Sequence, residues 1–479
     1  MELGRKTKIV ATIGPACSAM KPLRKVIEAG VDVCRLNFSH GTHAQHLEVL
    51  ERIRQIEAEL GRPVAVLQDL CGPKIRVTDI PNGAVELIEG QEVKVVAGLA
   101  ESKDPKVIGA SLENLATHAA PGHRLLFDDG LIELSVTEVD QLERTLTCRV
   151  VFGGVLKKRK GLNLPDTRLD VPSLTDKDRR DLLWGLEHGV DYVALSFVRH
   201  EDDAVALRDM ARGLDHPPRL IAKIEKPEAV ERLEAIVKAF DGVMVARGDL
   251  SVEIPLWDVP EVQKEIIRTA NLHDRIVITA TQMLDSMQER PRPTRAEVSD
   301  VANAIYDGTD AVMLSGETAS GQFPVESVKV MCRIARAADG HADRQYGSRR
   351  HESLVDTTTF CDPICGGAIT VARELSPCCL VAFTSTGKTA LYMSKYHPTK
   401  PVIGATADPH TLRRMALYRG VIPIQLDMST DRSEAVVVQA ERAIKERGLG
   451  QVGDVVVLVG GEHLGTKGNV NSLKVRRIE

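Results

Sequence analysis

The chain has 479 residues, which exceeds one ordinary hydrophobic core and predicts two or three domains. Its formal net charge of -5 is well mixed along the sequence, which argues against a nucleic-acid-binding or membrane-binding surface. No apolar run approaches the length of a membrane span, and residues 1–8 lack the apolar core of a signal peptide. We therefore expect a cytoplasmic protein.

Short apolar runs alternate with amphipathic stretches, which is the pattern of a parallel α/β fold. Eight of these runs predict strands, at 8–13, 31–37, 64–70, 192–197, 220–224, 242–246, 276–281 and 311–315. Helical patterns follow most of them, for example at 44–59, 176–187 and 259–272. Eight such units predict a closed (β/α)8 TIM barrel, which we assign to residues 1–72 and 172–340.

Residues 73–171 interrupt the alternation. They contain short strand patterns at 92–96, 124–127, 133–139 and 145–152, with Asp128-Asp129-Gly130 and Gly153-Gly154 as turn sequences. This pattern predicts a β-rich, barrel-like domain inserted after the third barrel strand, where it would act as a lid over the catalytic end.

A third unit follows the barrel. The composition turns polar from about residue 341, as expected of a linker or an exposed helix connection. A second α/β alternation then predicts strands at 379–383, 402–405, 422–425 and 454–459. We therefore predict a C-terminal α/β domain over residues 341–479.

Charged side chains gather where two successive barrel strands end, and (β/α)8 enzymes build their active sites at these ends. Lys223 and Glu225 point the same way because side chains alternate along a strand, and Asp249 follows the next strand. A lysine beside two carboxylates can hold a divalent cation and stabilise anionic oxygen. An ordinary ion pair at the end of a sheet is the alternative interpretation.

Other strand ends carry compatible groups. They place Arg35, Asn37 and Ser39 after the second strand, Asp69 after the third, Thr281 after the seventh and Ser315 after the eighth. Cations, carboxylates and hydroxyls converging in this way suit phosphoryl transfer with a bound divalent metal. The competing interpretations are that Arg35 and Asn37 fill the barrel interior and that Thr281 is an ordinary β-branched strand residue.

Four segments in register resemble the pyruvate kinase family: Ile221-Ala-Lys-Ile-Glu-Lys-Pro227, Val245-Ala-Arg-Gly-Asp-Leu250, Thr279-Ala-Thr-Gln-Met-Leu284 and Met313-Leu-Ser-Gly-Glu-Thr-Ala319. The resemblance covers nearly the whole chain. It implies a barrel with a β-rich lid and a C-terminal regulatory domain, assembled as a homotetramer. The implied reaction transfers the phosphoryl group of phosphoenolpyruvate to ADP, which gives pyruvate and ATP in the last step of glycolysis.

The resemblance also implies roles for individual residues. Glu225 and Asp249 would ligate Mg²⁺ or Mn²⁺, and a second metal ion would arrive with the nucleotide. Lys223 would neutralise the transferring phosphoryl group and the enolate oxygen, while Thr281 would help to protonate enolpyruvate. The implied catalytic residues are Arg35, Lys223, Thr281 and Ser315. The implied substrate-binding residues are Arg35, Lys223, Gly248, Asp249 and Thr281. The implied nucleotide-binding residues are Asn37, His40, Arg76 and Lys160. A basic surface turn is the alternative for Lys160.

One departure from the family bears on its monovalent cation. Many members hold K⁺ at positions matching Asn37, Ser39, Asp69 and the carbonyl of Leu70, and those members usually carry Glu where this chain has Lys74. The Lys74 ammonium could replace the cation, so we predict that the enzyme does not require K⁺. The alternative is that Lys74 faces solvent.

Residues 382–389 match a relaxed P-loop pattern after a predicted strand, which taken alone suggests a nucleotide-binding ATPase domain. The resemblance instead implies a loop that binds the phosphate of an allosteric effector, often a sugar phosphate. Its residues are Thr384, Ser385, Thr386, Gly387, Lys388 and Thr389, and the loop Gly460–Gly468 would form the other wall.

Two further functions fit parts of the sequence. A metal-dependent lyase acting on an oxoacid enolate would use the same Lys-Glu-Asp cluster, but it would not need ADP. A catalytically dead effector-binding protein is the other alternative, and the intact Lys223, Glu225, Asp249 and Thr281 argue against it.

Overall fold

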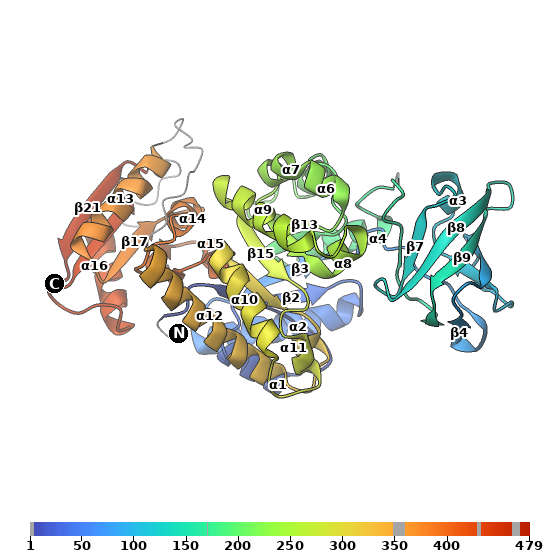
Figure 1. Ribbon diagram of the computed structural model, residues 1–479. Coiled ribbons are helices and arrows are strands. Elements are labelled where there is room, and N and C mark those ends of the chain that lie inside the picture. Colours follow the sequence, from blue (N-terminus) through green and yellow to red (C-terminus); the bar gives the residue numbers. More distant parts are fainter. Residues whose placement is uncertain (1–3, 170, 348–359, 429–432, 462–469) are drawn as a thin grey trace.

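The computed structural model describes residues 4–169, 171–347, 360–428, 433–461 and 470–479. These residues form a central barrel, an inserted β domain and a C-terminal α/β domain. Figure 1 shows the inserted domain and the C-terminal domain on opposite sides of the barrel. Within the described residues, every helix is too short or too polar to cross a membrane.

The central unit is a closed barrel of parallel strands, as the alternating pattern predicts. Around the barrel the order is β1-β2-β3-β12-β13-β14-β15-β16. The strands are β1 (Lys8–Thr12), β2 (Val33–Asn37), β3 (Ala65–Asp69), β12 (Tyr192–Leu195), β13 (Arg219–Ile224), β14 (Gly242–Ala246), β15 (Ile276–Ala280) and β16 (Ala311–Leu314). All eight expected strands are present, with ends that differ from the predicted ones by at most two residues.

Helices surround the barrel. They are α1 (Met20–Glu28), α2 (His43–Leu60), α4 (Asp176–Glu187), α5 (Asp203–Met210), α6 (Pro227–Glu231), α7 (Leu233–Ala239), α8 (Arg247–Glu253), α9 (Val259–Leu272), α10 (Arg295–Asp307), α11 (Gly316–Ala319) and α12 (Pro324–Tyr346), with the 3-10 turn η2 (Asp285–Gln288). Helices α2, α4 and α10 begin at capping boxes, in which the hydroxyl of Thr42, Thr175 or Thr294 accepts a backbone N–H of the first turn. Helix α12 continues to Tyr346, so residues 341–346 match the expected exposed helix connection and not the linker.

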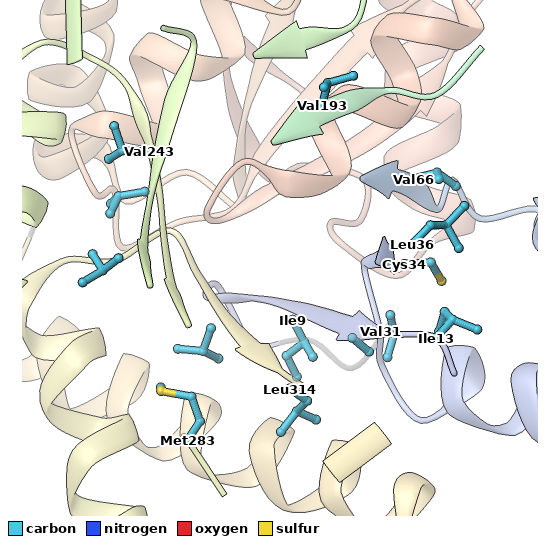
Figure 2. Close-up of a cluster of buried hydrophobic side chains, with 14 of the residues drawn as sticks. Ile9, Ile13, Val31, Cys34, Leu36, Val66, Val193, Val243, Met283 and Leu314 are labelled. Carbon is cyan, nitrogen blue, oxygen red and sulfur yellow. The ribbon is translucent and has the colours of Figure 1, made fainter. Parts of the chain in front are cut away.

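Side chains of the barrel strands divide between two hydrophobic clusters because successive residues face opposite sides of a strand. The outer cluster packs beneath the helices, and Figure 2 shows part of it, including Ile9, Val66 and Val243. The inner cluster includes Val10 and Leu67. It also contains residues of the C-terminal domain, so the two units share a core.

The inserted β domain contains a six-stranded sheet in the order β11-β7-β8-β9-β5-β6 and a two-stranded sheet, β10-β4. Its elements are η1 (Pro81–Gly83), β4 (Ala84–Leu87), β5 (Glu92–Ala97), β6 (Val107–Ala110), α3 (Leu115–His118), β7 (Arg124–Phe127), β8 (Ile132–Asp140), β9 (Thr145–Phe152), β10 (Gly154–Lys157) and β11 (Leu162–Asn163). The predicted β-rich insertion is confirmed. The strands that the sequence did not indicate, β4, β6, β10 and β11, are four residues long or shorter.

The C-terminal domain is a five-stranded sheet in the order β19-β18-β17-β20-β21. Its elements are α13 (Cys361–Leu375), β17 (Cys379–Phe383), α14 (Lys388–Lys395), β18 (Val402–Thr406), α15 (Pro409–Arg414), η3 (Met415–Leu417), β19 (Val421–Gln425), α16 (Ser433–Glu446), β20 (Val455–Gly460) and β21 (Ser472–Arg477). Strand β21 pairs antiparallel with β20 and was not predicted. The domain contacts the barrel through Tyr192, whose hydroxyl donates to the Arg414 carbonyl at 2.6 Å.

Candidate active site

The site is built on two neighbouring parallel strands. Strand β13 carries Lys223, which lies opposite Met244 of β14, and Glu225 follows β13 directly. Strand β14 ends at Ala246, and the short helix α8 then presents Asp249 in its first turn. The predicted positions of these three groups at the C-terminal ends of adjacent strands therefore match the observed elements.

Lys223 is the centre of a buried polar cluster. Its Nζ lies 2.8 Å from Glu225 Oε1 and 3.5 Å from Asp69 Oδ1, and it donates to Ser196 Oγ at 2.8 Å. Burial opposes its charge, but Asp69, Glu225 and Asp249 together raise the pKa of Lys223 above its usual value. A permanently charged ammonium therefore stands at this end of the barrel.

Arg35 is the second buried cation of the cluster. Its Nε lies 2.6 Å from Asp69 Oδ2, and its Nη1 donates to Thr12 Oγ1 at 2.9 Å. Burial opposes ionisation of Asp69, but Arg35 and Lys223 outweigh it and lower the pKa of that carboxyl. Arg35 thus belongs to the polar cluster and does not fill the apolar barrel interior.

Glu225 and Asp249 are the predicted metal ligands. Glu225 is fully buried, and its Oε2 accepts the Phe197 N–H at 2.8 Å. Burial and the charge of Asp249 raise the pKa of Glu225, whereas Lys223 opposes the shift. Within the described residues, no group of three or more His, Cys, Asp or Glu side chains forms a ready metal site. Two carboxylates nevertheless fit Mg²⁺, because this ion commonly takes one or two protein carboxylates and leaves its other positions to water and substrate phosphates.

Thr281 lies beside the first turn of α8. Its Oγ1 accepts the Gly248 N–H at 2.7 Å and donates to the Ala280 carbonyl at 2.6 Å. Its φ of 67° is in the left-handed region, which a β-branched residue rarely adopts. Arg247 stabilises this turn by donating to the Thr281 carbonyl at 2.7 Å. Thr281 is thus part of a constrained turn and not of the regular strand, which ends at Ala280.

Lys74 reaches the site from the segment that leads into the inserted domain. Its Nζ lies 3.5 Å from Asp249 Oδ1, and its side chain is 28% exposed. The Lys74 side chain therefore points toward Asp249 and not away into solvent. The ammonium instead adds a positive charge beside a predicted metal ligand.

The predicted nucleotide-binding residues are more dispersed. Partial burial and the charges of Arg76, Lys74 and Arg35 lower the pKa of His40. Arg76 Nη1 donates to the Arg159 carbonyl at 3.0 Å. Lys160 Nζ pairs with Asp128 Oδ1 at 2.6 Å, inside the inserted domain.

The remaining strand-end residues occupy the rim. Asn37 Oδ1 accepts the Ser39 N–H at 3.1 Å, and the Leu70 carbonyl accepts from Ser196 Oγ at 2.7 Å. Ser315 Oγ is buried without a hydrogen-bond partner in the described part of the chain. Its backbone N–H donates to Glu317 Oε2 at 2.7 Å.

The effector loop follows strand β17 and leads into helix α14. Thr384 Oγ1 accepts the Gly387 N–H at 2.9 Å, and Gly387 has a φ of 84°. Thr384 and Thr389 are buried, whereas Thr386 and Lys388 are exposed and Ser385 is partly buried. Most of the second predicted wall, Gly460–Gly468, lies outside the described residues.

Three further residues shape the site and were not singled out from the sequence. Ser196 follows the fourth barrel strand and contacts Lys223, and Thr12 ends the first strand and contacts Arg35. Glu317 is buried, and its Oε1 accepts the Leu284 N–H at 3.0 Å, which joins the loops after β15 and β16. The sequence could have indicated these residues only by their position, because each lies at or just beyond the end of a predicted strand.

Comparison with known proteins agrees with this geometry. A family model described as the barrel domain of pyruvate kinase matches residues 4–328, and one described as the pyruvate kinase alpha/beta domain matches residues 362–476. Pyruvate kinase of Geobacillus stearothermophilus is 44% identical over 477 residues, which are 99% of this chain and 80% of that protein. Pyruvate kinase of Clostridium perfringens is 41% identical over 478 residues, which are 99% of this chain and 100% of that protein.

Proposed function

This chain belongs to the pyruvate kinase family and is a phosphotransferase, and from this premise we propose how its own residues act in the reaction and which ions they need. Family membership implies phosphoenolpyruvate and ADP as substrates. The observation that carries the proposal is the contact of Lys223 with Glu225 at 2.8 Å and with Asp69 at 3.5 Å. It gives the barrel end a fixed cation within an acidic, buried cluster.

In the proposed reaction the bond between phosphorus and the enol oxygen of phosphoenolpyruvate breaks, and a terminal oxygen of ADP bonds to phosphorus. The electron pair stays on the enol oxygen, where we place the Lys223 ammonium so that its charge stabilises the enolate. Arg35 neutralises the phosphoryl group in transfer, and Ser315, whose buried Oγ has no partner among the described residues, can donate to a phosphoryl oxygen. Asp69 holds both cations in place, because it pairs with Arg35 and Lys223.

Glu225 and Asp249 would hold the divalent ion, Mg²⁺ or Mn²⁺. When bound, this ion supplies charge neutralisation between the substrate oxygens. The backbone around Gly248 and Asp249 receives the substrate carboxylate. On the nucleotide side, Asn37, His40, Arg76 and Lys160 contact ADP, which requires Lys160 to exchange Asp128 for a phosphate as the inserted domain closes.

Thr281 completes the reaction in this proposal. The enolate must gain a proton on its methylene carbon to become pyruvate. The Thr281 hydroxyl already donates to the Ala280 carbonyl, and it can donate instead to a water beside the substrate. Because ketonisation removes the enol, the proton transfer makes the overall reaction strongly favourable.

We further propose that the enzyme works without K⁺. The supporting observation is the Lys74 ammonium 3.5 Å from Asp249, which puts a protein cation beside a predicted metal ligand. An ammonium and K⁺ carry the same charge, so a second cation there would be redundant.

Regulation and assembly are also part of the proposal. The loop from Thr384 to Thr389 would bind the phosphate of an allosteric effector, and the chain would form a homotetramer, both as the family resemblance implies. The turn at Gly387 supports the loop assignment, because its positive φ lets the backbone fold back toward Thr384. Sedimentation of the full chain with and without sugar phosphates tests both points.

The decisive experiment measures pyruvate formation from phosphoenolpyruvate with Mg²⁺, with and without ADP, each in K⁺ and in tetramethylammonium salts. We expect pyruvate only with ADP and at similar rates in both salts. Pyruvate without ADP would indicate the lyase, and no turnover of the folded protein with either Mg²⁺ or Mn²⁺ would indicate an effector-binding protein. Activity that requires K⁺ would contradict only the role of Lys74.

A further inference from the structure

Helix α8 contributes both to the candidate active site and to the contact with the inserted domain. Its first turn carries Gly248 and Asp249, whereas its last turn carries Val252 and Glu253. Gly130 of the inserted domain packs close to Val252, since a Cβ atom added at Gly130 would lie 3.7 Å from Val252 Cγ1. One helix of seven residues therefore connects a predicted metal ligand with the inserted domain.

Glu253 joins the inserted domain to the barrel through one carboxylate oxygen. Its Oε1 lies 2.5 Å from Lys226 Nζ and accepts the Asn163 amide N–H at 2.7 Å. Lys226 belongs to the barrel and directly follows Glu225, and Asn163 ends strand β11 of the inserted domain. The side chains of Lys226, Glu253 and Asn163 are all buried.

The contact with Asn163 is favourable because Glu253 is a buried carboxylate. Such a group is costly unless donors surround it, and Glu253 has one charged and one neutral donor. Hydrogen bonds to an ionised group are about twice as strong as those between neutral groups. Asn163 is the donor that the inserted domain supplies, so moving this domain away from the barrel would cost the hydrogen bond.

The same cluster reaches the other predicted metal ligand. The Lys226 ammonium lies 5.9 Å from the centroid of the Phe197 ring, a distance at which a cation is attracted to an aromatic face. The Phe197 N–H donates to Glu225 Oε2 at 2.8 Å. Glu253 is thus connected to Asp249 through helix α8 and to Glu225 through Lys226 and Phe197.

The chain enters and leaves the inserted domain as a paired ribbon. The Val77 N–H donates to the Lys160 carbonyl at 2.8 Å, and the Leu162 N–H donates to the Ile75 carbonyl at 3.0 Å. Asn163 directly follows this ribbon. Because Lys160 and Asn163 are close together on one paired segment, the contact that holds Asn163 also limits where Lys160 can lie.

We propose that Asn163 and Glu253 form a latch that holds the inserted domain on the barrel and positions Lys160 for the nucleotide. Both act through Lys160 and are therefore positioning residues, and Lys226 fixes the Glu253 carboxylate. The consequence for catalysis rests on the proposed function, in which Lys160 contacts ADP. Without the latch, fewer molecules hold the inserted domain in the competent position, and the apparent affinity for ADP falls by that fraction.

Steady-state kinetics of the full chain test the latch. In Asn163→Ala the hydrogen bond is lost, and we expect the KM for ADP to rise at least about fivefold. The KM for phosphoenolpyruvate should change by less than about twofold, because the proposed contacts of this substrate lie on the barrel. Asn114→Ala removes an exposed amide of the inserted domain and should leave both constants unchanged. A KM for ADP that is unchanged or lower in Asn163→Ala would overturn the proposal.

Exchanging the two groups separates positioning from a general loss of stability. Asn163→Asp places a second carboxylate against Glu253 and should raise the KM for ADP more than Asn163→Ala does. Adding Glu253→Gln to this variant restores one donor and one acceptor, and Lys226 can pair with the new carboxylate. We expect the double variant to have a lower KM for ADP than Asn163→Asp alone. An equal or higher KM would count against the latch, because two independent losses of stability would add.

Small-angle X-ray scattering measures the latch without an assay of activity. A freed inserted domain samples more orientations, so the scattering curve of Asn163→Ala should depart from that of the wild type, whereas the curve of Asn114→Ala should match it. Matching curves for Asn163→Ala and the wild type would overturn the latch even in a chain that makes pyruvate. If the wild type made no pyruvate, the proposed function would fail, and the scattering curves alone would decide the latch.

Discussion

The Lys74 ammonium lies 3.5 Å from Asp249, so the segment entering the inserted domain contributes a charge to the site at the barrel end. The two side chains are 28% and 27% exposed, and water screens a pair of this kind. Its importance is therefore the sign of the charge beside the metal-binding carboxylates and not the stability of the pair.

Reversing this charge should create a requirement for K⁺. In Lys74→Glu, a third carboxylate would stand beside Asp249 and Glu225, and we expect kcat without K⁺ to fall by roughly tenfold or more. Added K⁺ should restore most of the rate. Steady-state assays in K⁺ and tetramethylammonium salts measure this, with Lys158→Glu, a lysine paired with Asp79 inside the inserted domain, as the control. Equal loss in both salts would mean that Lys74 has a different role.

Ser196 should position Lys223. Its hydroxyl accepts from Lys223 Nζ at 2.8 Å and donates to the Leu70 carbonyl at 2.7 Å. A hydrogen bond to a charged group contributes about 1.5–3 kcal/mol, so Ser196→Ala should lower kcat by roughly ten- to a hundredfold. Ser196→Thr, which keeps the hydroxyl, should recover part of this loss. Ser173→Ala removes another buried hydroxyl and should change kcat little; an equal loss there would point to a general packing effect.

The fold was predictable because its strands are short apolar runs separated by regular helical patterns. The two-residue alternation placed Lys223 and Glu225 on one face, and parallel neighbours brought Asp249 to the same end. Strand β21 was missed because its residues are all exposed or partly buried and show no alternation, and because its antiparallel pairing with β20 is a long-range contact. The local sequence does not indicate which distant strand a segment will pair with.

Site residues that lie at the ends of barrel strands could be predicted from the sequence. Contacts that depend on how the domains pack against one another could not. Ser196 is a small polar residue, and only the fold shows that Lys223 reaches it. Likewise, the sequence leaves the direction of the Lys74 side chain open, because that direction depends on the approach of the inserted segment to α8. The contact of the Tyr192 hydroxyl with the Arg414 carbonyl also depends on how the barrel and the C-terminal domain are placed together.

Thr281 should combine local strain with a catalytic hydroxyl. Its φ of 67° is unfavourable for a β-branched residue, and its hydroxyl accepts the Gly248 N–H at 2.7 Å. We expect Thr281→Val to lower kcat by roughly a hundredfold with little change in the KM for phosphoenolpyruvate, and Thr281→Ser to retain most activity. Steady-state kinetics decide this; if Val and Ser behave alike, the hydroxyl does not take part in proton transfer.

Asp274 should make stability depend on pH. Burial and the nearby Asp362 raise its pKa to about 6, although Lys395 opposes the shift. The folded chain therefore holds this proton more tightly than the unfolded chain, so the stability falls as the pH rises from the ordinary pKa of 3.8 to about 6 and stays low above that. Asp274→Asn should stabilise the protein by up to about 3 kcal/mol near pH 7.5 and by about half as much near pH 5.

Thermal melts of the wild type and Asp274→Asn at the two pH values check this expectation. The left-handed backbone of Asp274, with a φ of 53°, suits asparagine, so the substitution adds no strain. A stabilisation that is equal at both pH values would mean that the gain does not come from titration of this carboxyl.

Lys395 should anchor the C-terminal domain to the barrel. Its ammonium pairs with Asp310 and donates to Asn271 Oδ1 at 2.9 Å, and the side chains of Lys395 and Asp310 are 1% and 0% exposed. Lys395→Met would leave a buried carboxylate without its cation, a change that costs about 3–5 kcal/mol. We expect a clear fall in the urea midpoint, whereas Lys238→Met, which breaks an exposed pair with Glu234, should leave the urea midpoint nearly unchanged. If both variants unfold alike, the Val277 N–H, which donates to Asp310 at 2.8 Å, stabilises the carboxylate more than Lys395 does.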